Sequence, residues 1–198
     1  MRQQQRSIET RNRILESAQA RFAEHGYDAT GVAELCEAAG ISKGAFYHHF
    51  PSKQAVFLAL LNRWMGQLDE GFQVARSDAR DVSHAIDRMA ELIQPILQQG
   101  QEHLPLLFEF WLQARREPAV WAAAIEPYRR YQVYFADLIR QGITEGSLKP
   151  VDPEPAAQAL VSLAVGLLLQ GVLDRERPDW ARVAQASVHI YLQGLQTK

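Results

Sequence analysis

Apolar residues recur at helical spacing along nearly the whole of this 198-residue chain, and that periodicity is the feature that most restricts its fold. Strand signals are almost missing, because no runs of alternating Val, Ile and Thr stand between Asn-Gly or Asp-Gly turns. Apolar positions at intervals of three and four residues indicate helices instead. The sequence therefore predicts an all-α protein of about nine helices.

The helix boundaries follow from capping residues and from breaks in the pattern. Gly26 is placed to end the first helix in the left-handed conformation, and Thr30 can cap a short second helix. Ser42 and Ser52 stand at the starts of the third and fourth helices. The expected helices cover about residues 7–25, 32–36, 42–50, 52–72, 81–98, 103–115, 118–141, 153–173 and 179–194.

Charge and composition exclude several classes of protein. A net charge of −2 argues against a protein coated in nucleic acid, so any such contact must be local. The single Cys36 cannot form an internal disulfide, and no zinc-ligand spacing surrounds it. The polar N-terminus lacks the apolar core of a signal peptide, and the longest apolar run, residues 159–173, is shorter than the roughly 20 residues that span a bilayer. We expect a cytoplasmic protein without a metal, a cofactor or a membrane partner.

One segment, GISKGAFYHHFPSK at residues 40–53, has an unusual charge pattern. No Asp or Glu occurs between Glu37 and Asp69. On a helix, the residues of this segment divide between two faces. The inward face gathers Phe46, His49 and Phe50. The outward face presents Lys43, Gly44, Tyr47 and His48, with Ala45 at the border.

Two short helices joined by a glycine-containing turn, the second basic on its free face, are typical of a helix-turn-helix. In that motif the second helix enters the major groove of DNA, and Lys53 could neutralise a phosphate. Aromatic residues at helical spacing are more often simply core. His48 and His49 do not indicate a metal site, because neighbours on a helix diverge by about 100° and no third ligand is near.

The sequence from about Thr10 to Leu61 also resembles the DNA-binding half of TetR-family transcriptional regulators. The resemblance rests on RILESA, FAEHGY and GISKGAFYHHFPSK. It implies an all-helical homodimer with a DNA-binding domain at residues 1–53 and a ligand-binding and dimerisation domain at residues 54–198. By position, it assigns groove contacts to Lys43, Gly44, Ala45, Tyr47 and His48, phosphate contacts to Thr30, Ser42, Tyr47 and Lys53, and a basic arm to Arg2, Arg6 and Arg11.

The second half of the chain is rich in aromatic residues. Most of them should be ordinary core, but mixed Tyr, Trp and Met side chains also line apolar ligand cavities. Glu109 could pair with a cationic ligand, although a solvated surface charge is the commoner role for such a residue. The candidate pocket consists of Met65, Leu68, Met89, Leu107, Phe108, Trp111, Tyr128, Tyr131 and Phe135.

The last two expected helices carry apolar stripes that include small residues. In the family that the first half resembles, the last two helices pair with those of a second copy. The candidate dimer interface consists of Ala159, Leu163, Gly166, Leu167, Gln170, Leu173, Val183, Ala186 and Ile190.

Together these features predict a dimeric repressor that leaves a pseudo-palindromic operator when a small, largely apolar effector binds. An activator built on the same helix-turn-helix is the alternative. An all-helical enzyme is a weaker one, because HExxH, GxSxG and phosphate-binding glycine loops are absent from the sequence.

Overall fold

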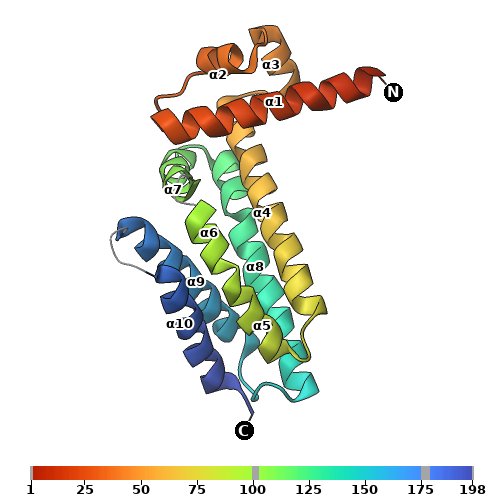
Figure 1. Ribbon diagram of the computed structural model, residues 1–198, viewed down its shortest axis with the longest axis vertical. Helices are drawn as coiled ribbons and strands as arrows, with labels where there is room; N and C mark the ends of the chain where they lie inside the picture. The colour runs from red at the N-terminus through yellow and green to blue at the C-terminus, as the bar shows by residue number, and fades with distance from the viewer. Residues whose placement is uncertain (1, 100–102, 175–178, 198) are drawn as a thin grey trace. The chain divides into compact units, whose positions relative to one another are not determined.

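The computed structural model describes residues 2–99, 103–174 and 179–197. Within these ranges every named element is a helix, which confirms the all-α prediction (Figure 1). The helices are α1 (Arg2–His25), α2 (Val32–Ala39), α3 (Lys43–His49), α4 (Lys53–Ser77), α5 (Val82–Glu91), α6 (Ile93–Gln99), α7 (His103–Ala114), α8 (Pro118–Glu145), α9 (Pro153–Leu173) and α10 (Trp180–Leu195).

The chain folds as two compact units, each assembled from two stretches of sequence. The first unit comprises Met1–Met65 and Pro105–Ala124, and the second comprises Gly66–Leu104 and Ile125–Lys198. Two long helices, α4 and α8, contribute residues to both units. The domain boundary that we expect after residue 53 stays a prediction.

The core of the first unit is dominated by aromatic rings. Phe22, Phe46, Phe57 and Phe110 have no exposed surface. Phe110 of α7 stacks on Phe57 of α4, with their ring centroids 4.1 Å apart. Burial of each such ring contributes about 1.5–3 kcal/mol, so α7 is as much part of this core as α1 is.

The connection between α1 and α2 departs from the expected capping. Gly26 ends α1 with a positive φ of 83°, as predicted. The cap of α2, however, is Gly31, whose N–H donates to Glu34 Oε2 at 2.6 Å. Thr30 is fully buried instead, and its hydroxyl donates to the Gly26 carbonyl at 2.8 Å. The prediction of Thr30 as the cap is wrong because its side chain closes the α1–α2 loop from within.

Two further helix boundaries differ from the sequence pattern. The single helix expected over residues 81–98 is two helices that meet at Leu92, with Pro95 in the first turn of α6. A proline is tolerated there because the first-turn N–H groups have no helical partner. Pro127, by contrast, lies inside α8 without ending it, and α8 continues through Gly142 to Glu145.

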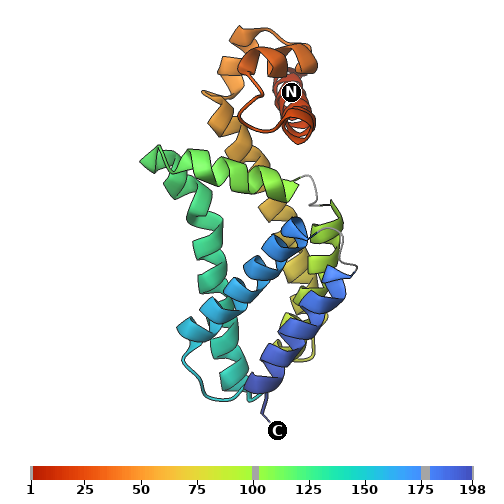
Figure 2. The ribbon, with the colours of Figure 1, turned by 90° about the vertical axis from the view of Figure 1, so that its left-hand side faces the viewer.

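The second unit packs α10 against α5, α6 and α9 (Figure 2). Packing at Gly142 excludes a side chain, since a Cβ atom there would lie 2.6 Å from the buried Leu148 Cδ1. Helix α9 covers residues 153–173, as the sequence predicts, and by its length and composition alone it could span a membrane. Its most apolar window has a mean hydropathy of 1.9, yet only 28% of that window is buried.

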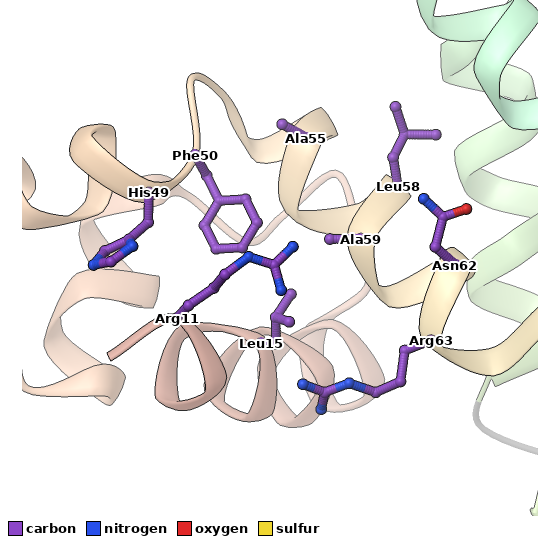
Figure 3. Close-up of a pocket in the computed structure, with 9 residues that line it drawn as sticks. All are labelled: Arg11, Leu15, His49, Phe50, Ala55, Leu58, Ala59, Asn62 and Arg63. Carbon is purple, nitrogen blue, oxygen red and sulfur yellow. The ribbon is translucent and has the colours of Figure 1, made fainter. Parts of the chain in front are cut away.

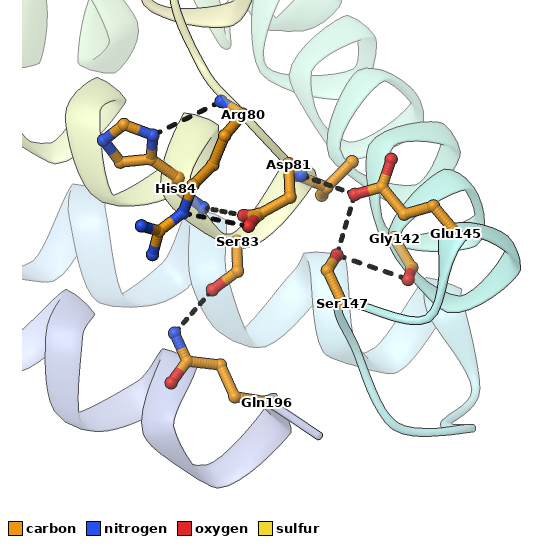
Figure 4. A network of polar contacts seen from close by, with 9 residues as sticks. Arg80, Asp81, Ser83, His84, Gly142, Glu145, Ser147 and Gln196 are labelled. Atoms are coloured by element: carbon orange, nitrogen blue, oxygen red, sulfur yellow. Dashed lines mark hydrogen bonds and ion pairs between the residues drawn. The ribbon is translucent and has the colours of Figure 1, made fainter. Parts of the chain in front are cut away.

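A polar network ties the end of α10 to the start of α5 and the end of α8 (Figure 4). The Glu145 carboxylate accepts the Val82 N–H at 2.6 Å and the Ser147 hydroxyl at 2.8 Å. Gln196 Nε2 donates to the Oγ of Ser83, a buried residue, at 2.6 Å. These bonds satisfy buried and helix-terminal polar groups at this end of the second unit.

Candidate nucleic-acid interface

Helix α3 is held at both ends by its own sequence. The Ser42 side chain accepts the Ala45 N–H at 3.1 Å, which confirms the predicted cap. Gly40 makes the preceding turn with a φ of 63°, a conformation that glycine adopts at little cost. At the other end Phe50 is extended, as the following Pro51 requires, and the helix stops.

The two faces of α3 differ as the helical spacing predicts. Phe46 and Phe50 are buried, and His49 and Ala45 are half-buried. Tyr47 keeps 55% of its surface exposed, although its ring edge contacts Phe46. The exposed positions of α3 are Lys43, Gly44, Tyr47 and His48.

Gly44 has no structural reason to lack a side chain. Its φ lies outside the positive region, and a Cβ atom there would meet only Ser42 Oγ, at an ordinary 3.8 Å. Alanine is favoured over glycine in helices by roughly 0.5–1 kcal/mol. A bare backbone at an exposed helical position is instead suited to close approach by an external surface.

Lys53 is half-buried, and its ammonium group makes contacts within the protein. Its ammonium group donates to the carbonyl oxygens of Tyr27 at 2.7 Å and Thr30 at 2.9 Å, with the Asp28 carbonyl at 3.4 Å. It also lies 4.3 Å from the centroid of the Tyr27 ring. Burial lowers the pKa of Lys53, and the carboxylates of Asp28, Glu109 and Glu34 oppose that effect. Because an ammonium has three donors, the phosphate contact that the sequence suggested would have to replace one of these contacts, and it stays a prediction.

Thr30 is unsuited to its predicted phosphate contact, since its side chain is fully buried. Ser42 and Tyr47 are exposed and keep hydroxyl protons that can be donated. The expected basic arm is helical, because Arg6 and Arg11 lie within α1. The Arg2 side chain lies outside the described part of the chain.

Glu109 of α7 also contacts the α1–α2 loop. Its carboxylate accepts the Tyr27 N–H at 3.0 Å and the Asp28 N–H at 2.7 Å. Gln113, one turn later, donates to the Asp28 carboxylate. The sequence offered Glu109 as a ligand group or a solvated charge, and neither describes it. More than 80 residues separate the partners, so no local pattern could have revealed the contact.

Two titratable groups of this unit are perturbed by burial. Burial raises the pKa of Tyr27, and the Asp28, Glu117 and Glu109 carboxylates add to that effect. Burial lowers the pKa of His49, as do the neighbouring His48 and Arg11. In the described residues no three His, Cys, Asp or Glu side chains gather as a metal site.

The nine candidate pocket residues divide between the two units. Leu107 and Trp111 pack on the first core, whereas Tyr128 and Tyr131 pack on the second, in which Met89 and Phe135 are buried. Met65 and Phe108 belong to the first unit and Leu68 to the second. That these nine side chains form one pocket stays a prediction.

The candidate dimer residues are mostly unburied within the chain. Leu173 is 75% exposed, Ile190 69% and Val183 38%. Ala159, Gln170 and Ala186 are also exposed, and Leu163 and Gly166 are half-buried. Leu167 is the exception, because it is buried in the core of its own unit and is not free to meet a second copy.

Two protein-family models match the chain over most of its length. The model of bacterial regulatory proteins of the tetR family matches residues 14–60. The model of the BetI-type transcriptional repressor C-terminal domain matches residues 82–196.

Individual relatives agree with these matches. The HTH-type transcriptional regulator UidR of Escherichia coli K12 is 28% identical over 94% of this chain and 89% of its own. The HTH-type transcriptional repressor KstR2 of Mycobacterium tuberculosis H37Rv is 31% identical over 71% of this chain and 70% of its own. A crystal structure of a putative TetR-family regulator from Mesorhizobium loti has a TM-score of 0.77 and 25% identity, covering 97% of this chain and 99% of that one.

These proteins are transcriptional regulators rather than enzymes, which confirms the prediction that this chain is not an enzyme. The matches cover both the exposed, basic α3 and the helices that follow it in sequence. The chain therefore belongs to the TetR family of transcriptional regulators, with a helix-turn-helix at its N-terminus and a BetI-type repressor domain at its C-terminus.

Proposed function

We propose that the protein is a dimeric repressor that binds a pseudo-palindromic DNA operator through α3 and releases it when a small, largely apolar effector binds. The observation that carries this proposal is the outward face of α3. Lys43, Gly44, Tyr47 and His48 are exposed there, and no carboxylate occurs in the sequence from residue 38 to residue 68. Such a face suits the major groove, where side chains read base edges and cations meet phosphates.

The proposed groove contacts are Lys43, Gly44, Ala45, Tyr47 and His48, and the proposed phosphate contacts are Ser42 and Tyr47. We leave Thr30 and Lys53 out of the contact set, since their polar groups are used internally. Their role is to fix the α1–α2 loop and so to hold the helix-turn-helix in shape.

The proposed dimer is supported by the apolar face of α9 and α10. Leu173, Val183 and Ile190 leave much of their surface in solvent in the single chain. Large apolar side chains left exposed on two helices that contact each other favour association with another apolar surface. A two-fold dimer would present two copies of α3, which requires an operator with two inverted half-sites. The protein would then work in the cytoplasm, where the DNA is.

The proposed effector site lies in the second unit, among the aromatic side chains of α4 and α8. Phe72 contacts Tyr131, Tyr134 and Phe135 at centroid distances of 5.5–5.9 Å. Tyr131 donates to the Asp69 carboxylate at 2.9 Å, which gives this apolar cluster a polar edge. We propose that α4 transmits the effect of effector binding to the DNA-binding helices, since its residues 53–65 belong to the first unit and its residues 66–77 to the second. Release requires that the effector bind the DNA-free conformation more tightly than the DNA-bound one.

The test is selection of bound duplexes from a random pool at moderate salt, followed by sequencing. Salt suppresses the phosphate contacts that give affinity without sequence preference. We expect an enriched sequence with two inverted half-sites. Enrichment of a single half-site would contradict the dimer, and an absence of any enrichment with a well-folded protein would contradict the proposed operator-binding mode. A candidate effector that binds the free and operator-bound protein equally well would contradict release.

A further inference from the structure

A groove in the first unit lies between α1, the end of α3 and the first turns of α4 (Figure 3). The groove is open to solvent and has a volume of about 550 Å³, which is within the size range of small-molecule sites. Its residues come from three separate elements, so the groove is a product of the helix-turn-helix fold. Neither the groove contacts nor the phosphate contacts of the proposed function use it.

The polar side chains of the groove are two arginines, an asparagine and the imidazole of His49. Arg11 enters from α1, and Asn62 and Arg63 enter from α4 (Figure 3). The Arg11 guanidinium carbon lies 5.0 Å from the centroid of the Phe50 ring, and Arg63 Nη2 donates to Asn12 Oδ1 at 3.2 Å. None of the described residues that line the groove is Asp or Glu.

These two arginines differ from others in the chain. Arg21, Arg130 and Arg140 each form an ion pair with a carboxylate. In the described ranges, 2–99, 103–174 and 179–197, neither Arg11 nor Arg63 has such a partner. Most of their guanidinium donors are therefore available to an external anion, for which the planar, always charged group is well suited.

The floor of the groove is apolar. Ala55, Leu58 and Ala59 of α4 are half-buried and provide its accessible apolar surface, whereas Leu15 and Phe50 are almost fully buried. A bare phosphate would gain nothing from such a floor, whereas an organic anion would bury its apolar part on it.

We propose that this groove binds a small organic anion, such as a carboxylate, whose charge is met by Arg11 and Arg63 and whose apolar body lies on Ala55, Leu58 and Ala59. The site is separate from the proposed effector site, since its lining residues all belong to the first unit.

The test uses the full-length, isotopically labelled protein and three probes: sodium octanoate, its neutral relative octanamide, and inorganic phosphate. Backbone amide shifts in residues 11–15, 49–50 and 58–63 report on the groove itself, so octanoate bound elsewhere is not mistaken for a positive result. We expect octanoate to shift these resonances saturably, and octanamide and phosphate to bind at least about tenfold more weakly.

Two variants locate the charge and the apolar contact. Replacing both arginines (Arg11→Gln with Arg63→Gln) should weaken octanoate at least about tenfold, whereas Arg13→Gln, an exposed cation on the same helix, should not. Leu58→Glu places a carboxylate at the groove and should weaken octanoate binding by a similar factor. This single variant still tests the site if the double variant folds poorly. If octanamide binds as tightly as octanoate, the proposed preference for an anion is overturned. If phosphate binds as tightly as octanoate, the proposed apolar contact is overturned. An absence of shifts, or unchanged binding in both variants, would overturn the site.

Discussion

The two compact units leave opposite kinds of surface exposed. In the first unit, α3 shows solvent a lysine, a glycine, a tyrosine and a histidine, while its phenylalanines are buried. In the second unit, α9 and α10 show solvent Leu173, Val183 and Ile190. The difference indicates different partners, because a polyanion attracts cations and polar donors whereas an apolar face is satisfied by another apolar face. Substitutions on α3 should therefore lower DNA binding, whereas substitutions on α9 and α10 should impair dimerisation.

The largest effect is expected from charges on the apolar face of the second unit. In Leu173→Asp combined with Ile190→Asp, two carboxylates would be buried unpaired in the proposed dimer interface. We expect a monomer and an operator affinity at least about 100-fold lower, to be measured by analytical ultracentrifugation and by titration of labelled operator.

The matched control for that variant is Val74→Asp with Val133→Asp. These valines are 58% and 62% exposed and belong to the same unit, but they lie on α4 and α8. They should leave the dimer intact. If the control dissociates and the first variant does not, the dimer surface has been assigned to the wrong helices.

Removing the outward groups of α3 should separate DNA binding from assembly. We expect Lys43→Ala with Tyr47→Ala to lower operator affinity by about 10- to 100-fold, because each lost base or phosphate contact is worth one or a few kcal/mol. Both side chains are exposed, so the unfolding midpoint and the dimer should not change. Arg129→Ala, an exposed cation in the second unit, is the control. Retained affinity in the double variant would show that another surface reads the operator.

The hydrogen bonds from the α1–α2 loop to Glu109, called the loop clamp below, connect α7 to the rest of the first unit. Substitutions at Glu109 measure how much they contribute to stability. Glu109→Ala leaves the Tyr27 and Asp28 N–H groups without their acceptor and should lower the free energy of unfolding by about 1–2 kcal/mol. Glu109→Gln keeps one acceptor oxygen and should cost less. Urea unfolding measures both, and an alanine variant as stable as the parent would mean that the clamp contributes nothing.

Gly44→Ala should change stability and DNA binding in opposite directions. The added methyl group meets only ordinary contacts inside the protein, so the free energy of unfolding should rise by up to about 0.5–1 kcal/mol. Operator affinity should fall if DNA approaches the bare backbone closely. Thermal unfolding and an operator titration on the same sample check both signs, and unchanged affinity would place Gly44 outside the contact surface.

The smallest effect is expected at Tyr27, whose buried hydroxyl has no hydrogen-bond partner among the residues that the structure describes. Tyr27→Phe keeps the ring contacts with Phe22, Phe57 and Phe110 and removes an unsatisfied polar atom. The free energy of unfolding should be unchanged or higher by up to about 1 kcal/mol. A clear loss of stability in urea would show that the hydroxyl has a partner after all, such as a bridging water.

Much of this molecule could be predicted from local sequence. The cap at Ser42, the left-handed Gly26 and the division of α3 into two faces each depend on residues within one or two turns. The prediction that Thr30 caps α2 was wrong because its hydroxyl is buried and donates to the Gly26 carbonyl, so it does not cap the helix. The candidate pocket could not be derived, since helical spacing places a side chain on a face but does not say which of two cores that face meets.

The sequence by itself determined that the chain is helical, that α3 carries a basic outward face, and that its family is one of DNA-binding regulators. Those properties depend on hydrophobic periodicity, on helix-capping residues and on a local sequence motif. Only the tertiary structure decided that Lys53 and Glu109 contact the same loop, that α7 shares a core with α1, and that Leu167 is buried while Leu173 is not. The physical reason is that these outcomes depend on contacts between residues distant in the chain, whose energies appear only once the helices have packed.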